Sequence, residues 1–284
     1  MKTIIGVGLG LIGGSMLLSL KRFYQQAEFL GEDNNEDHLQ QANDLNIVSR
    51  KAKDQDFKTA DLVIVSIPVD TAPKLIEKLL DQVGTQTLVI DTGSTKAKLC
   101  EHLAKHPKRD QFMATHPIAG TEFSGPQAAF PSLFDHKTMI ICEIEKTNLK
   151  LQQRAIQCFE NMQMNLRYMN PVAHNKHMAY VSHLSHISSF MLGKTVIDKE
   201  ENERNIFDLA GSGFESTVRL AKSNPATWTP IFKQNKTFVL EALSEYIHNL
   251  KNFEKVLEHD NFEQLYKDMN NTNIVKDILK GIKL

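Results

Sequence analysis

The stretch Met1–Ser15, MKTIIGVGLGLIGGS, decides how this chain is expected to fold. A β-prone start runs into the spacing Gly-x-Gly-x-x-Gly, and the apolar run 16–20 that follows suits a helix packed on a sheet. This order is typical of a dinucleotide-binding βαβ unit. Gly8 would permit the tight turn, Gly10 the approach of a pyrophosphate, and Gly13 the contact between helix and strand. The helix N-terminus would hold the phosphates on its free N–H groups.

A second β-prone run, residues 27–31, ends beside Glu32 and Asp33. Asp33 follows the last glycine of the turn at about the distance where a carboxylate binds the ribose hydroxyls of NAD. We prefer Asp33 to Glu32 because alternate side chains at a strand tip point to opposite faces. A carboxylate there would repel the 2′-phosphate of NADP, so the pattern favours NAD. The predicted cofactor-binding residues are Gly8, Leu9, Gly10, Leu11, Ile12, Gly13, Asp33, Ser66 and Pro68.

The apolar N-terminus, flanked by Lys2 and Lys21–Arg22, also resembles a signal peptide or membrane anchor. Its glycines argue against this, since each glycine inside a helix costs about 1 kcal/mol relative to alanine. No clean small-x-small cleavage site follows. The net charge of −1 offers no electrostatic reason to bind nucleic acid or an anionic membrane. Three cysteines are too few and too scattered for a disulfide framework or a zinc site. We expect a cytoplasmic protein.

Strand-like and helix-like runs alternate over the first part of the chain. The strand-like runs are 61–68, 87–91, 111–115 and 138–142, and the helix-like runs are 34–44, 72–80, 98–104 and 149–162. This alternation predicts an α/β fold with a doubly wound, mostly parallel sheet, whose ligand crevice lies at the carboxyl ends of the strands. Longer helical patterns then follow at 172–196, 202–222, 230–257 and 262–282. We expect a dinucleotide-binding domain over 1–170 and an all-helical domain over 171–284.

Several chemically useful residues follow predicted strands directly. Ser94 and His116 stand at neighbouring strand ends, where a hydroxyl could fix the tautomer of the imidazole and leave its other nitrogen free as a base. A hydrolase is a poorer fit because Gly-x-Ser-x-Gly is absent. In the helical part, Arg219 could bind a carboxylate and Trp228 could line a pocket, although either could equally be a surface or packing residue.

Four histidines invite a metal-site interpretation: His174, His177, His183 and His186. On one continuous helix, at about 100° per residue, the first pair and the second pair point to roughly opposite sides. They would not converge on one ion, so we predict no metal. We expect one or two of them to face the crevice.

Five segments, taken together, resemble the prephenate dehydrogenase family in the order in which that family carries them. They are residues 8–15 (GLGLIGGS), 91–96 (DTGSTK), 116–122 (HPIAGTE), 181–186 (VSHLSH) and 219–225 (RLAKSNP). The resemblance spans the whole chain and is that of a monofunctional member, with no mutase segment before the glycine turn and no regulatory domain after the helices. Glu215 departs from it, since some relatives carry a basic residue there.

The resemblance implies NAD-dependent oxidative decarboxylation of prephenate to 4-hydroxyphenylpyruvate, a step of tyrosine biosynthesis. It implies that the helical domain binds substrate and forms a homodimer. By the same resemblance, His116 would be the base or hydrogen-bond acceptor for the substrate hydroxyl, and Ser94 would orient it. The implied substrate-binding residues are His186, Arg219, Glu122 and Trp228.

Three other functions stay open at this point. An arogenate dehydrogenase would use the amino analogue of the same substrate. A β-hydroxyacid dehydrogenase shares the two-domain plan but needs a lysine base, for which Lys176 is a weak candidate. A dinucleotide-sensing protein without turnover would not need Ser94, His116 and Arg219 together.

Overall fold

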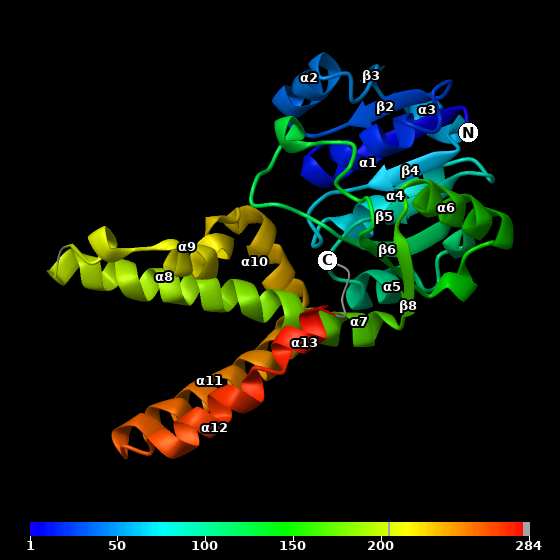
Figure 1. Ribbon diagram of the computed structural model, residues 1–284. Helices are drawn as coiled ribbons and strands as arrows, with labels where there is room; N and C mark the ends of the chain where they lie inside the picture. The colour runs from blue at the N-terminus through cyan, green and yellow to red at the C-terminus, as the bar shows by residue number, and fades with distance from the viewer. Residues whose placement is uncertain (204, 281–284) are drawn as a thin grey trace.

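The structure is a computed structural model that describes residues 1–203 and 205–280. Eight strands form one sheet in the order β3-β2-β1-β4-β5-β6-β7-β8 (Figure 1). Neighbouring strands run parallel except for the antiparallel pair β6 and β7. The strands are β1 Thr3–Val7, β2 Glu28–Glu32, β3 Arg50–Lys51, β4 Leu62–Val65, β5 Leu88–Asp91, β6 Phe112–Ile118, β7 Thr138–Cys142 and β8 Asn165–Met169. The predicted doubly wound, mostly parallel α/β fold is confirmed.

Helices cover both faces of this sheet. They are α1 Leu11–Lys21, α2 Glu36–Asp44, α3 Asp54–Thr59, α4 Ala72–Gln82, α5 Ala97–Leu103 and α6 Leu149–Asn161. Because successive strand residues point to opposite faces, Ile4 belongs to the core under α1, α2 and α6, and Ile5 to the core under α3, α4 and α5. Side chains such as Phe159 on one face and Leu80 on the other are fully buried. The central strands are therefore apolar on both sides, as parallel strands buried on both faces must be.

The expected strand 111–115 proved too short. β6 continues through His116 and Pro117 to Ile118, because it pairs with the antiparallel strand β7 along this length. His116 therefore lies inside the strand, opposite Ile140, and does not follow its end. Two short elements, β3 and α3, were not predicted at all.

One residue, Asn170, separates β8 from the helical part. Its α-helices are α7 Pro171–Met178, α8 Leu184–Glu203, α9 Ser212–Val218, α10 Pro225–Gln234, α11 Lys236–Glu258, α12 Phe262–Thr272 and α13 Val275–Lys280. In Figure 1, α8, α9 and α10 form one arm, and α11 and α12 form a second that points away from the sheet. Among residues 1–203 and 205–280, none of the helices combines the length and the apolar character that a membrane span requires.

The predicted helix boundaries in this part need four corrections. A π-helical turn, Ala179–His183, interrupts the expected helix 172–196. The single helix expected over 202–222 is wrong, since α8 ends at Glu203 and the described residues 205–222 form the short α9 and two 3₁₀ turns. The expected helix 230–257 is two helices that meet at Asn235. The last expected helix is also two, α12 and α13, and its predicted end at Ile282 lies outside the described residues.

Candidate active site

The glycine turn between β1 and α1 is packed tightly against the end of β4. Gly8 has a φ of +87°, and a Cβ on it would lie 2.3 Å from the carbonyl oxygen of Ser66. A Cβ on Gly13 would lie 2.0 Å from the carbonyl oxygen of Gly8. By contrast, a Cβ on Gly10 would meet nothing within 4 Å. The protein thus fills the space at two of the glycines and leaves it open at the third, where the backbone of a dinucleotide fingerprint must admit a pyrophosphate.

Asp33 lies directly against this turn. Its carboxylate accepts a 2.8 Å hydrogen bond from the N–H of Leu9 and a 2.9 Å bond from the N–H of Asn35. The side chain is buried at the end of β2. Gly10 occupies the N-cap position of α1, and no side chain caps the first N–H groups of this helix. A carboxylate at the ribose position and free helix N–H groups at the phosphate position fit a bound NAD.

Ser66 and Pro68 hold the next strand end in place. The hydroxyl of Thr92 donates a 2.9 Å hydrogen bond to the Ser66 hydroxyl, which links the ends of β4 and β5. The carbonyl of Pro68 accepts a 3.1 Å bond from the N–H of Ala72 at the start of α4. Ser66 borders the glycine turn, since its backbone carbonyl and its Cβ lie against Gly8 and Gly13. Contact of Ser66 and Pro68 with a cofactor stays a prediction.

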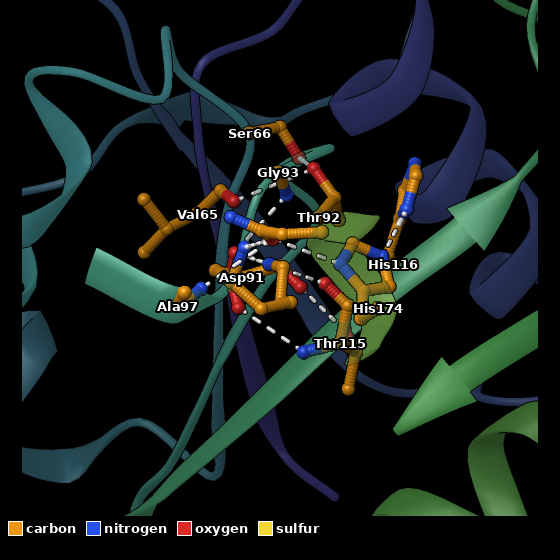
Figure 2. Close-up of polar contacts among 11 residues, drawn as sticks. Val65, Ser66, Asp91, Thr92, Gly93, Ala97, Thr115, His116 and His174 are labelled. Carbon is orange, nitrogen blue, oxygen red and sulfur yellow. Dashed lines mark hydrogen bonds and ion pairs between the residues drawn. The ribbon is translucent and has the colours of Figure 1, made fainter. Parts of the chain in front are cut away.

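A buried ion pair lies between β5 and β6. Lys96 contacts the carboxylate of Asp91 and donates a 2.7 Å hydrogen bond to the carbonyl of Thr115. The same carboxylate accepts bonds from the N–H of Thr115 at 3.1 Å and of Gly93 at 3.0 Å (Figure 2). Burial raises the pKa of Asp91, and the charge of Lys96 partly offsets this. The pair fixes the loop that carries Ser94 beside the strand that carries His116, and the sequence pattern does not predict it.

His116 points to the opposite face of β6 from Thr115 and meets a second histidine. Its Nδ1 lies 2.9 Å from Nε2 of His174, and the two rings stand edge to face at 75° (Figure 2). His174 in turn places its Nδ1 3.2 Å from Oδ1 of Asn175. His116 is 8% exposed and the other two are almost fully buried. Strand β6 and helix α7 thus meet at the imidazole of His116.

These histidines are neutral at physiological pH. Burial, followed by the proximity of His174 and the charge of Lys96, holds the pKa of His116 well below its usual 6.5. Burial lowers the pKa of His174 to about 3 and that of His183 to about 4. A neutral imidazole has a free lone pair, so His116 can accept a proton at pH 7.

Ser94 does not orient His116 in this structure. Within residues 1–203 and 205–280, the hydrogen-bond partner of the ring is His174, and the half-buried Ser94 makes no hydrogen bond to it. The expected hydroxyl–imidazole pairing is replaced by an imidazole pair because α7 brings His174 in from the helical part. A contact of Ser94 with a ligand stays a prediction.

The other predicted site residues form two pairs, one within the helical part and one between it and the loop after β6. His186 stacks on Trp228 with ring centroids 3.3 Å apart. Nη1 of Arg219 lies 3.6 Å from a carboxylate oxygen of Glu122, which comes from the loop after β6. Burial lowers the pKa of His186, and the positive charge of Arg219 lowers it further. The two pairs therefore interact electrostatically. His183 is edge-on to Trp228 at 5.9 Å and also lowers the pKa of His116.

The prediction for the four histidines assumed one continuous helix, but the π-helical turn Ala179–His183 separates α7, which carries His174 and His177, from α8, which carries His186. His174 and His183 are both fully buried, whereas His177 is exposed. The π-helical turn holds more residues per turn than an α-helix and shifts the angular phase between His174 and His183.

Comparisons with known proteins agree with this arrangement. Residues 17–168 match the family model of the prephenate dehydrogenase nucleotide-binding domain, and residues 170–271 match that of the prephenate dehydrogenase dimerization domain. The chain is 28% identical to prephenate dehydrogenase of Bacillus subtilis over 99% of this chain and 76% of that protein. It is also 28% identical to cyclohexadienyl dehydrogenase of Zymomonas mobilis, over 88% of this chain and 86% of that protein.

A solved structure matches almost the whole chain. It is that of Aquifex aeolicus prephenate dehydrogenase in complex with hydroxyphenyl propionate and NAD+. The TM-score is 0.89 at 30% identity, with 98% of each chain covered.

Proposed function

We propose, because this chain belongs to the prephenate dehydrogenase family, that it catalyses the oxidative decarboxylation of prephenate to 4-hydroxyphenylpyruvate. The chain is an NAD-dependent oxidoreductase, a dehydrogenase of tyrosine biosynthesis. The choice of prephenate is supported by relatives at 28% and 30% identity that bear its name. The observation that carries the catalytic part of the proposal is the buried, neutral imidazole of His116 within β6.

The chemistry asks for one base and accurate alignment. Prephenate carries a hydroxyl at C4 and a carboxylate at C1 of a cyclohexadiene ring, and loss of CO₂ from C1 makes that ring aromatic. Bound NAD supplies the acceptor for the hydride from C4. His116 takes the proton of the C4 hydroxyl, for which its depressed pKa keeps it unprotonated. Ser94, on the neighbouring loop, contacts the same hydroxyl.

The residues of the helical part hold the rest of the substrate. The side chain of Arg219 is 52% exposed, and its 3.6 Å pair with Glu122 is a partly solvated one that contributes little to stability. A substrate carboxylate can therefore replace Glu122 as the partner of Arg219 and bind the guanidinium in bidentate fashion. The stacked pair of His186 and Trp228 gives a flat, partly polar wall for the ring.

The variant His116→Asn tests the catalytic assignment. It removes the base and keeps a polar side chain, so kcat/KM for prephenate should fall by about 10²–10⁴ while the affinity for NAD stays unchanged. NADH formation and NAD titration measure the two quantities. His177→Asn is the matched control, because His177 is exposed on the same helix as His174 and should leave both unchanged. A His116→Asn enzyme as fast as the parent would refute the assignment.

Arogenate is the second candidate substrate, and one observation favours it. Glu122 places a carboxylate beside Arg219. The ammonium of arogenate would bind this carboxylate. The two reactions share the chemistry at C4, so His116 would serve both. The ratio of kcat/KM for prephenate to that for arogenate decides between them, and a Glu122→Gln variant should shift this ratio toward prephenate if Glu122 binds the ammonium.

The organisation of the chain completes the proposal. We place the dinucleotide-binding domain at 1–170 and the substrate-binding helical domain at 171–284, and two copies pair through the latter. An exposed apolar stripe on α11 supports this pairing, since successive members are seven, three, three and four residues apart and so share one helix face. They are Leu240, Ile247, Leu250, Phe253 and Leu257.

A further inference from the structure

A chain of buried hydrogen bonds ends on Asn175, and the identity of one atom there can be deduced. Oδ1 of Asn175 lies 2.7 Å from the backbone N of Lys96 and 3.4 Å from that of Ala97. Backbone N–H groups only donate, so the atom that faces them must be the amide oxygen. An amide oxygen has lone pairs and no proton, and it can therefore only accept from any further neighbour.

That further neighbour is His174, and its tautomer follows. Nδ1 of His174 lies 3.2 Å from the same oxygen and must donate to it. Because burial keeps His174 neutral, its single ring proton is then on Nδ1. Nε2 of His174 is left with a lone pair.

The same logic passes to His116. Nε2 of His174 is an acceptor, so Nδ1 of His116, 2.9 Å away, must carry the proton of that bond. Nε2 of His116 is then the nitrogen with the free lone pair. We infer that His174 and Asn175 are positioning residues that hold His116 in the Nδ1-protonated tautomer, with Nε2 unprotonated toward the substrate. This inference deepens the proposed function and rests on it for its consequence in catalysis.

The tautomer matters because the two nitrogens of a neutral imidazole have opposite roles. With the proton on Nε2, His116 would donate to the substrate hydroxyl and could not receive its proton. With the proton on Nδ1, Nε2 receives it, and the resulting imidazolium keeps its Nδ1–H bond to His174. The amide of Asn175 cannot take a proton onward, so the proton stays on the imidazole pair.

A second buried side chain, that of Asn235, holds the backbone of Asn175 in place. The Nδ2 of Asn235 donates a 2.7 Å hydrogen bond to the backbone carbonyl of Asn175 and lies 3.1 Å from Nδ1 of His183. Asn235 is 2% exposed and stands at the break between α10 and α11. The charged and titratable groups that act on the imidazole pair are Lys96, with its partner Asp91, then His183, and His177 on α7 itself.

The direct test is ¹⁵N NMR of the full-length protein labelled at histidine. At neutral pH the signal of His116, assigned by its loss in His116→Gln, should show a protonated Nδ1 and an unprotonated Nε2. A proton on Nε2 would overturn the inference. This readout needs no turnover, so an enzyme with the expected tautomer but no activity on prephenate would reject the proposed function and leave the inference standing.

Three variants test the consequence. His174→Phe keeps a ring but removes the acceptor, and kcat should fall at least about tenfold with KM little changed. His174→Gln, which returns an acceptor oxygen, should recover most of that loss. Asn175→Asp keeps every acceptor bond but adds a negative charge, which favours protonated imidazole. It should therefore shift the acid limb of the kcat/KM profile to higher pH, a change that a purely structural role would not produce.

His177→Phe, on an exposed position of α7, is the control for aromatic substitution and should match the parent. Circular dichroism and thermal unfolding show which variants are folded. A folded His174→Phe enzyme with parental kcat, or an Asn175→Asp enzyme with an unmoved acid limb, would contradict the assignment. Should His174→Phe not fold, the Asn175→Asp profile and the NMR tautomer decide on their own.

Discussion

Lys96 is a fully buried lysine, which proteins tolerate only when its charge is paired. Here it contacts Asp91, and Asp91 in turn binds backbone N–H groups on two neighbouring segments. The pair therefore joins the end of β5 to β6, and the positive charge of Lys96 helps to keep His116 unprotonated.

Removal of this lysine should destabilise the protein strongly. Lys96→Met leaves the carboxylate of Asp91 buried without its partner, which costs about 3–5 kcal/mol in the free energy of unfolding. The exposed pair of Lys194 and Asp198 gives the comparison, because Lys194→Met should cost less than about 1 kcal/mol. Urea unfolding of both variants measures the difference, and equal losses would contradict the structural role of the buried pair.

Single residues were also where prediction from sequence stopped short. The spacing of strand-like runs predicted His116 close to the carboxyl end of its strand, but the partner of its ring could not be predicted from spacing. His174 reaches it from 58 positions further along the chain, and only packing of α7 against the sheet edge brings the two rings together. Lys96 lies in the motif that carried the family resemblance, yet nothing in its local sequence marks it as buried.

At the scale of elements, substitutions in the glycine turn should separate effects on stability from effects on NAD binding. Gly13→Ala would push a Cβ to 2.0 Å from the carbonyl of Gly8, so this variant should lose stability as well as NAD. Gly10→Ala meets no protein atom within 4 Å and should unfold at the parental temperature. Its methyl group occupies the space offered to the pyrophosphate, and its Kd for NAD should rise at least about tenfold.

Thermal unfolding and isothermal titration with NAD separate these outcomes. If Gly10→Ala binds NAD as tightly as the parent, the turn does not hold the pyrophosphate in the way described.

Elements were predictable where burial leaves a strong pattern. β4 and β5 are apolar runs buried on both faces, and their positions follow from that alone. β3 has only two residues, too few for any periodicity. The break at Asn235 is set by a tertiary contact, since its side chain bonds to Asn175 on another helix, and helical periodicity carries no sign of it.

At the scale of the whole molecule, the exposed apolar stripe on α11 is best explained by a second copy of the chain. Leu250→Asp places a charge in that stripe and should convert a dimer into monomers. Lys251→Asp, next to it on the same exposed helix, changes charge outside the stripe and should remain dimeric. Sedimentation velocity distinguishes the two, and a Leu250→Asp protein that sediments as the parent does would place the interface elsewhere.

The bonds between α7 and the ends of β5 and β6 bear on how such an enzyme can diverge. His174 and Asn175 travel with the helical half of the chain, yet they set where the proton of His116 sits in the other half. A chimaera that exchanged the helical half for that of a relative would transplant the substrate contacts and the basicity of the catalytic imidazole together. In this architecture, a change in substrate preference and a change in the pH range of activity would occur together.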